Sequence, residues 1–241
     1  SFCFNSARQR GKEIMNSLEN TLIEDKLCVV IPMKSPQRSK QRLVNSMTNE
    51  ARESLSLNLF HNTLAFFQEH FPMLDVLVVS ESLDVLGLAQ SYEANTLFDD
   101  GEKGLNGALD FACDWVKKSG YDSQLIIPGD IAVLNPNEVR ELIGAAYDAE
   151  VVIAVAKDGG TNALLTSPPD AIEFEYGNQS ARIHKGNAFE NGLTCHSLNF
   201  THLALDIDHS EDLKQAVIRA PERFNAWKKC LISPVKERRY A

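Results

Sequence analysis

The chain has 241 residues, of which 44% are hydrophobic and 24% are charged, and its formal net charge is −9. This is the composition of an ordinary globular protein, and its acidic balance argues against a nucleic-acid-binding surface, which needs a basic face. No apolar run approaches the length of a membrane span, and the five scattered cysteines contain no CxxC pair, a pattern typical of a reducing compartment. We therefore expect a cytoplasmic protein that acts on small molecules, with neither nucleic acid nor membrane as a partner.

Residues 1–26 are mostly polar, with Ile14 and Leu18 among the apolar side chains at helical spacing. The spacing predicts a short amphipathic helix, packed on the domain or on a neighbouring subunit of a homodimer, or else an ordered tail. We expect this N-terminal extension to precede a functional domain over residues 27–220. Residues 214–241 are expected to form a closing helix and a basic C-terminal tail, and the tail is assigned to residues 221–241.

The first apolar run, residues 27–31, ends at Pro32 and leads directly into a basic loop. A short apolar run bounded by a turn signal indicates a strand buried on both faces, as in parallel sheets. In open α/β sheets, ligands bind beyond the carboxyl ends of such strands. The cations of the loop are Lys34, Arg38, Lys40 and Arg42. Lysine and arginine at this position favour phosphate binding, and a solvated basic loop is the alternative that the spacing leaves open.

Helical and strand patterns then alternate along the chain. The sequence predicts helices over residues 48–71, 83–92, 108–118 and 136–146, and strands over residues 75–80, 96–98, 125–127 and 150–157. Strands that alternate with helices of this length favour an α/β fold with a mostly parallel, doubly wound central sheet.

A glycine-rich segment, DDGEKGLNGAL over residues 99–109, comes immediately before one of these helices. Its central residues are Gly104, Leu105 and Asn106. The start of a helix presents free backbone N–H groups and a partial positive charge, which suits nucleotide binding. A flexible loop in which Asn106 is an ordinary helix cap is the alternative.

Three aspartates follow predicted strands or lie at their ends. Asp130 comes soon after the strand at residues 125–127, and Asp206 and Asp208 lie at the end of a further strand expected over residues 203–207. On a strand, the spacing of this pair would place both carboxylates on one face, roughly 7 Å apart. Because such carboxylates repel each other unless a cation is near, the pattern favours a divalent metal. The alternative is that Asp130 is a turn residue and Asp208 a helix cap.

Two further loops, over residues 158–165 and 175–186, combine glycines with hydroxyl side chains. The candidate ligands in them are Thr161, Gly177 and Ser180. Glycine lets backbone amides approach an anion closely, and a serine at the start of a helix adds a donor. The pair of loops favours a small anionic substrate, although turn chemistry between strands would give a similar pattern.

In this order, the motifs resemble the guanylyltransferase family of coenzyme F-420 biosynthesis, which has a GT-A-like nucleotide-diphospho-sugar transferase fold. The resemblance covers residues 27–213. The matching positions are Pro32 and Lys34, Lys40 with Arg42 and Leu43, Gly104 to Asn106, Pro128 with Asp130, Gly160 to Leu164, Gly177 with Ser180, and Leu205 with Asp206 and Asp208. The family commonly has a second proline soon after the strand-end aspartate, where this chain has Ala132.

The resemblance implies a nucleotidyltransferase that moves GMP from GTP to the phosphate of 2-phospholactate, phosphoenolpyruvate or 3-phosphoglycerate and releases pyrophosphate. It also implies roles for the site residues: Lys34, Lys40 and Arg42 for the triphosphate, Gly104 to Asn106 near the base, Thr161, Gly177 and Ser180 for the acceptor phosphate, and Asp130, Asp206 and Asp208 for Mg²⁺. Of these, the resemblance makes Lys34, Lys40, Arg42 and Asp130 the catalytic residues.

Two rival interpretations remain from the sequence. One is a non-catalytic nucleotide-binding protein with the same fold, which intact charged residues in the motifs argue against. The other is a different GT-A-like enzyme, such as a molybdopterin or sugar-nucleotide nucleotidyltransferase. Those enzymes are expected to carry a glycine-rich loop after the first strand, whereas the loop here is basic and has no glycine.

Overall fold

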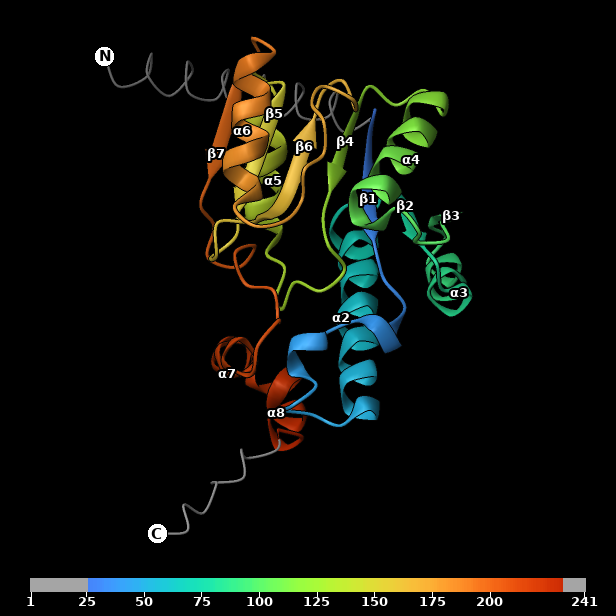
Figure 1. Ribbon diagram of the computed structural model, residues 1–241, viewed down its shortest axis with the longest axis vertical. Coiled ribbons are helices and arrows are strands. Elements are labelled where there is room, and N and C mark those ends of the chain that lie inside the picture. The colour runs from blue at the N-terminus through green and yellow to red at the C-terminus, as the bar shows by residue number, and fades with distance from the viewer. Residues whose placement is uncertain (1–25, 232–241) are drawn as a thin grey trace, which may run out of the picture.

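The computed structural model describes residues 26–231. Its centre is a seven-stranded sheet with helices on both faces (Figure 1). The helix expected within residues 1–26 lies outside the described residues, as do residues 232–241 of the expected tail. Within the described part of the chain, no helix is long and apolar enough to cross a membrane.

The strand order is β3-β2-β1-β4-β6-β5-β7. The strands are β1 (Leu27–Pro32), β2 (Asp75–Ser80), β3 (Asn95–Phe98), β4 (Ser123–Ile126), β5 (Val151–Val155), β6 (Thr161–Thr166) and β7 (Cys195–Leu198). β6 runs antiparallel to both of its neighbours, and all the other pairs are parallel. The predicted α/β fold with a mostly parallel sheet is therefore confirmed, with one antiparallel strand in it.

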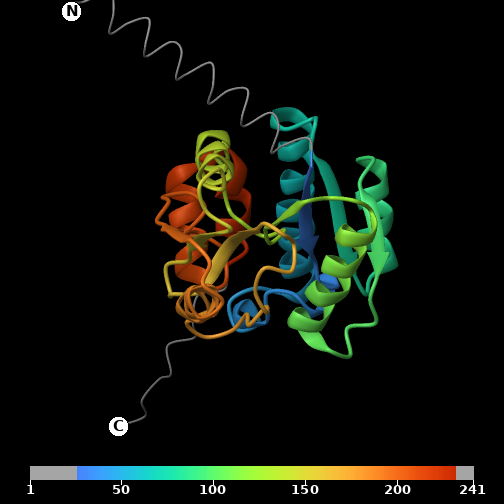
Figure 2. The same cartoon turned by 90° about the horizontal axis from the view of Figure 1, so that it is seen from above.

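The continuous apolar run of β1 is explained by its position in the middle of the sheet. Successive side chains of a strand point to opposite faces. Val29 and Ile31 accordingly pack with helices α2 (Asn49–His70), α3 (Leu83–Ser91) and α5 (Pro136–Ala145). Cys28 and Val30 pack on the other face with α4 (Gly104–Lys118) and α6 (Ser180–Glu190). The view in Figure 2 shows these two layers of helices on either side of the sheet.

A third apolar cluster joins the amino-terminal half of α2 to two carboxyl-terminal helices, α7 (Ser210–Arg219) and α8 (Pro221–Lys229). The described part of the segment expected as a tail from residue 221 is helical, and Phe224, a fully buried side chain, anchors this helix. Pro221 at the first helical position starts α8 without losing a helical hydrogen bond.

The strand expected over residues 203–207 is wrong. Among the described residues, this segment makes only one isolated bridge, between Ile131 and Asp206. Its apolar side chains are buried because the segment runs between two cores. β7 was not predicted, because it is a partly exposed edge strand with a polar sequence, CHSL. Helix α4 begins at Gly104, four residues earlier than expected, so the Gly-Leu-Asn motif forms its first turn.

Candidate active site

A cleft with a cavity volume of about 800 Å³ lies at the edge of the sheet where β1, β2 and β4 end. The loop after β1 forms one wall, and the segment around Tyr176 and Gly177 forms another. Because β6 runs antiparallel to its neighbours, its first residues, Thr161 and Asn162, lie at this same edge. The reversal of one strand thus brings the glycine-containing loop of residues 158–160 to the end of β4.

The basic loop is folded into two short 3-10 turns, Pro36–Arg38 and Gln41–Leu43. Arg52 of α2, a buried side chain, holds it by donating to the backbone carbonyls of Gln37 and Ser39. Lys40, between the two turns, adopts a left-handed conformation with φ 54°, which is uncommon for a residue other than glycine. This backbone conformation helps to direct the Lys40 side chain inward, and its exposed fraction is only 2%.

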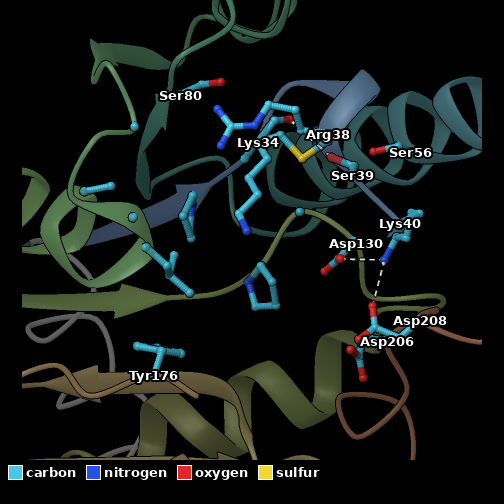
Figure 3. A pocket seen from close by; sticks show the side chains of 18 of the residues that line it. Lys34, Arg38, Ser39, Lys40, Ser56, Ser80, Asp130, Tyr176, Asp206 and Asp208 are labelled. Atoms are coloured by element: carbon cyan, nitrogen blue, oxygen red, sulfur yellow. Dashed lines mark hydrogen bonds and ion pairs between the residues drawn. The ribbon is translucent and has the colours of Figure 1, made fainter. Parts of the chain in front are cut away.

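Lys40 lies among the predicted metal-binding aspartates (Figure 3). Its ammonium nitrogen is 2.5 Å from Asp130 Oδ2 and 3.7 Å from Asp208 Oδ1. Arg42 donates to the other oxygen of Asp208 over 2.8 Å. Lys40 and Arg42 of the basic loop therefore form one charged cluster with Asp130 and Asp208, although the paired residues are 90 to 168 residues apart in the chain.

Asp206 completes the acidic side of this cluster. Burial, together with the negative charges of Asp130 and Asp208, raises the pKa of Asp206 from its ordinary value of 3.8 to about 6, against the opposing effect of Lys40. The carboxylates of Asp130 and Asp208 thus disfavour the ionised form of Asp206. Asn162 contributes a donor to Asp206 Oδ1 over 3.4 Å.

The donor set suits Mg²⁺, which prefers oxygen ligands and commonly uses one or two carboxylates together with substrate phosphates. Among residues 26–231, however, no three His, Cys, Asp or Glu side chains are already arranged to hold a metal ion. The ammonium group of Lys40 supplies positive charge to Asp130 and Asp208 in this arrangement. The carboxylate chemistry therefore fits a divalent cation, while the spacing of the side chains is that of an ion pair with Lys40.

The opposite wall is held by side chains that stand behind the cleft surface. Asn106 accepts from the backbone N–H of Tyr176 over 2.8 Å and donates to its carbonyl, which fixes the residue before Gly177. Gly177 has φ 148°, a conformation that favours glycine. Thr161 lines the cleft, and its hydroxyl is 2.9 Å from that of Ser180.

His184 supports the same wall from the core. It is fully buried, and its Nε2 accepts from the backbone N–H of Glu175 over 3.0 Å. Burial lowers the pKa of His184 to about 4, so the ring is neutral near pH 7. Since Nε2 is the acceptor, Nδ1 carries the proton and donates to the Thr161 hydroxyl over 3.0 Å. The oxygen of Thr161 therefore has a fixed donor behind it.

The cleft brings together most of the site residues that the sequence predicts. Those that line it are Lys34, Lys40, Arg42, Gly104, Leu105, Asp130, Thr161, Gly177, Asp206 and Asp208. Asn106 and Ser180 do not line it, and they contact the wall from behind. Sequence reasoning missed Glu81 and Arg52. Glu81 directly follows β2, a position that could have marked it, whereas no local pattern marks Arg52, whose role depends on a contact between a helix and a loop.

The comparisons with known proteins agree with this geometry. The family model described as "Guanylyl transferase CofC like" matches residues 27–228. A 3-phospho-D-glycerate guanylyltransferase from Colwellia psychrerythraea is 40% identical over 187 residues, which are 77% of this chain and 89% of that protein. A 2-phospho-L-lactate guanylyltransferase from Methanothermobacter thermautotrophicus is 33% identical, over 80% of this chain and 85% of that protein. A phosphoenolpyruvate guanylyltransferase from Sphaerobacter thermophilus is 31% identical, over 80% and 93%.

Solved structures support the fold. A protein from Desulfovibrio desulfuricans described as a nucleotide-diphospho-sugar transferase superimposes with a TM-score of 0.64 at 16% identity, covering 85% of this chain and 91% of that one. A CMP:2-keto-3-deoxy-manno-octonic acid synthetase complexed with CTP gives a TM-score of 0.56 at 11% identity, covering 82% and 99%. The basic loop, the aspartates and the two glycine-containing walls surround one cleft, and the family match extends over all of these elements. This chain therefore belongs to the CofC-like guanylyltransferase family.

Proposed function

We propose that this protein transfers GMP from GTP to the phosphate of 3-phospho-D-glycerate, as a step of coenzyme F-420 biosynthesis. The family supplies the reaction, guanylyl transfer to a phosphorylated three-carbon acid. The choice among the three acids rests on the relative from C. psychrerythraea, whose identity of 40% exceeds the 33% and 31% of the relatives that act on 2-phospho-L-lactate and phosphoenolpyruvate.

The observation that carries the proposed mechanism is the cleft, in which a cationic loop and an aspartate cluster lie beside a wall of hydroxyl and backbone donors. In the proposal, Lys34, Lys40 and Arg42 bind the triphosphate. Thr161 and Gly177 bind the phosphate of the acceptor. Ser180 and Asn106 then hold that wall in position, Ser180 through the Thr161 hydroxyl and Asn106 through the backbone of Tyr176.

The reaction needs little covalent chemistry from the protein. An oxygen of the acceptor phosphate attacks the α-phosphorus of GTP in line, the bond from the α-phosphorus to the bridging oxygen breaks, and pyrophosphate leaves. The attacking phosphate is already ionised near neutral pH, so no general base is required. Catalysis then consists of positioning and of neutralising charge on the phosphates.

In this proposal Asp130, Asp206 and Asp208 would hold Mg²⁺. The ion would supply positive charge to the phosphate oxygens. The ionised form of Asp206 is needed for this, and its raised pKa places the ionisation near pH 6. Lys40 pairs with two of these aspartates, so its ammonium group already offsets part of their negative charge.

The test is a turnover assay that follows pyrophosphate release from GTP and Mg²⁺ with 3-phosphoglycerate, 2-phospholactate or phosphoenolpyruvate supplied separately. We expect the highest kcat/KM with 3-phosphoglycerate. A preference for another of the three acids would overturn the choice of acceptor and keep the guanylyl transfer. Measurable GTP binding without turnover on any of the acids would favour a non-catalytic nucleotide-binding protein instead.

A further inference from the structure

A charged pair that the proposed mechanism does not use lies at the end of β2. Glu81 directly follows this strand and lines the cleft, although its side chain is only 18% exposed. Its Oε1 accepts from the backbone N–H of Ser35 over 2.9 Å and lies 3.7 Å from the Arg38 guanidinium. Among the described residues, its second oxygen, Oε2, makes no hydrogen bond. The cleft therefore contains a carboxylate with one fixed and one unused oxygen beside an arginine.

This pair lies away from the aspartate cluster. In Figure 3, Arg38 and Ser80, the last residue of β2, are on the side of the cleft opposite Asp130 and Asp208, and the Lys34 side chain extends between the two groups. If the phosphates of a nucleotide lie near Lys34 and Lys40, its nucleoside would therefore lie on the side of the cleft that contains Arg38 and Glu81. Leu105 of α4 lines the cleft here and offers apolar surface for the face of a base.

The backbone around the pair is shaped to approach it closely. Gly101 also lines the cleft and has φ 78°, a conformation that favours glycine. A Cβ atom added to Gly101 would lie 3.8 Å from Arg38 Nη1 and 3.9 Å from Glu81 Cβ. Asp99 holds this turn by accepting from the Gly101 N–H over 3.0 Å. Arg38 and Glu81 are thus enclosed on one side by the turn before α4.

A carboxylate in a cleft for a triphosphate has to face a part of the ligand that carries donors, because it would repel the phosphates. Guanine presents an acceptor, O6, next to two donors, N1–H and the 2-amino group. Adenine presents the reverse pattern, with the 6-amino donor next to the N1 acceptor. An arginine beside a carboxylate is complementary to guanine and opposed to adenine at both positions.

We propose that Arg38 and Glu81 determine the selectivity for guanine, with Arg38 donating to O6 and the free oxygen of Glu81 accepting from N1–H and the 2-amino group. This inference rests on the proposed function, in that GTP is the nucleotide in the cleft. The pair thereby adds a base-reading site to the phosphate-binding and metal-binding groups of the same cleft.

The substitution Glu81→Gln tests the proposal with little structural change. The carbonyl oxygen of the glutamine can still accept from Ser35 N–H, which turns the amide nitrogen toward the cleft in place of the free carboxylate oxygen. A donor would then face the donors of guanine. We expect the ratio of kcat/KM for GTP to kcat/KM for ATP to decrease by a factor of about 5 to 150, which is the range for one bidentate base contact. ITP, which keeps O6 and N1–H and lacks the 2-amino group, should lie between GTP and ATP in the wild type and lose most of its advantage over ATP in the variant.

Glu102→Gln is the matched control, because Glu102 is exposed, lies outside the cleft lining and loses the same charge. It should leave the GTP to ATP ratio unchanged. An equal loss of kcat/KM for GTP, ITP and ATP in Glu81→Gln would overturn the proposal in favour of a ribose contact, and 2′-deoxy-GTP and 3′-deoxy-GTP would then be insensitive to the substitution. An unchanged ratio in a folded variant would also overturn it.

The proposed reaction can fail independently of this inference. If the wild-type protein releases no pyrophosphate with any of the three acids, the same comparison is made by calorimetric binding of GTP and ATP to the wild type and to Glu81→Gln. Should Glu81→Gln not fold, Glu81→Asp keeps the charge and withdraws the carboxylate by one methylene. It is expected to reduce the GTP to ATP ratio as well, and an unchanged ratio there contradicts the base contact.

Discussion

Replacing Lys40 by methionine removes a buried ammonium group and keeps most of the side-chain volume. The Lys40 side chain is 2% exposed, and its partners Asp130 and Asp208 are 30% and 35% exposed. Removing one partner of a fully buried ion pair costs about 3–5 kcal/mol. Because the two aspartates are about one third exposed and solvent screens them, we expect a smaller loss of about 2–3 kcal/mol in the free energy of unfolding. In a domain of this size the melting temperature should fall by roughly 4–12 °C.

The assay is urea unfolding in metal-free buffer, together with pyrophosphate release from GTP under saturating conditions. Turnover should fall by about 100-fold or more, as when a group that stabilises transition-state charge is removed. Lys26→Met is the control, because Lys26 also pairs with an aspartate but the pair is about two thirds exposed, and its loss should change neither quantity measurably. Lys40→Gly and Lys40→Ala isolate the backbone effect, because both lack the ammonium group and nearly all of the side chain: at φ 54° glycine is unstrained, so Lys40→Gly should be about 1 kcal/mol more stable than Lys40→Ala. A Lys40→Met protein that matches the wild type in both stability and turnover would refute the reasoning.

Three further predictions follow from other parts of the structure. Because the pKa of Asp206 is raised, the folded protein keeps a proton that the unfolded chain loses, and the stability of the metal-free protein should decrease as the pH rises from about 4 to 6. Mg²⁺ should then raise the melting temperature more at pH 7.5 than at pH 5. The substitution Asp206→Asn should abolish this difference between the two pH values. Thr161→Val should raise the KM for the phosphorylated acid by about tenfold or more and leave the KM for GTP unchanged, whereas Thr161→Ser should retain wild-type values. Equal changes in both KM values would contradict the proposed contact between Thr161 and the acceptor phosphate. Phe224→Ala should destabilise the protein by about 3–5 kcal/mol in chemical unfolding, and a neutral effect would mean that α8 is not part of the core.

The sequence by itself determined the class of fold and indicated which residues are candidates for a phosphate site. Residues 27–31 and 75–80 are continuous apolar runs, and such runs identify buried parallel strands because both faces of the sheet are covered. Lys34 and Lys40 could be predicted to bind a ligand because the loop that carries them follows the first of these strands. These features depend on neighbours in the chain, and local periodicity is therefore enough to reveal them.

The tertiary structure alone decided how these groups meet. The antiparallel direction of β6, the pairing of Lys40 with Asp130 and Asp208, and the pairing of Arg38 with Glu81 each join positions that are far apart in the chain. The segment before Asp208 shows most directly what the sequence does not determine, since its apolar residues indicated a strand. A strand also requires a partner along its length, and within residues 26–231 this segment has one only at Ile131. The apolar side chains of a segment indicate that it is buried, whereas its strand pairing depends on which other segment of the chain lies beside it in the fold.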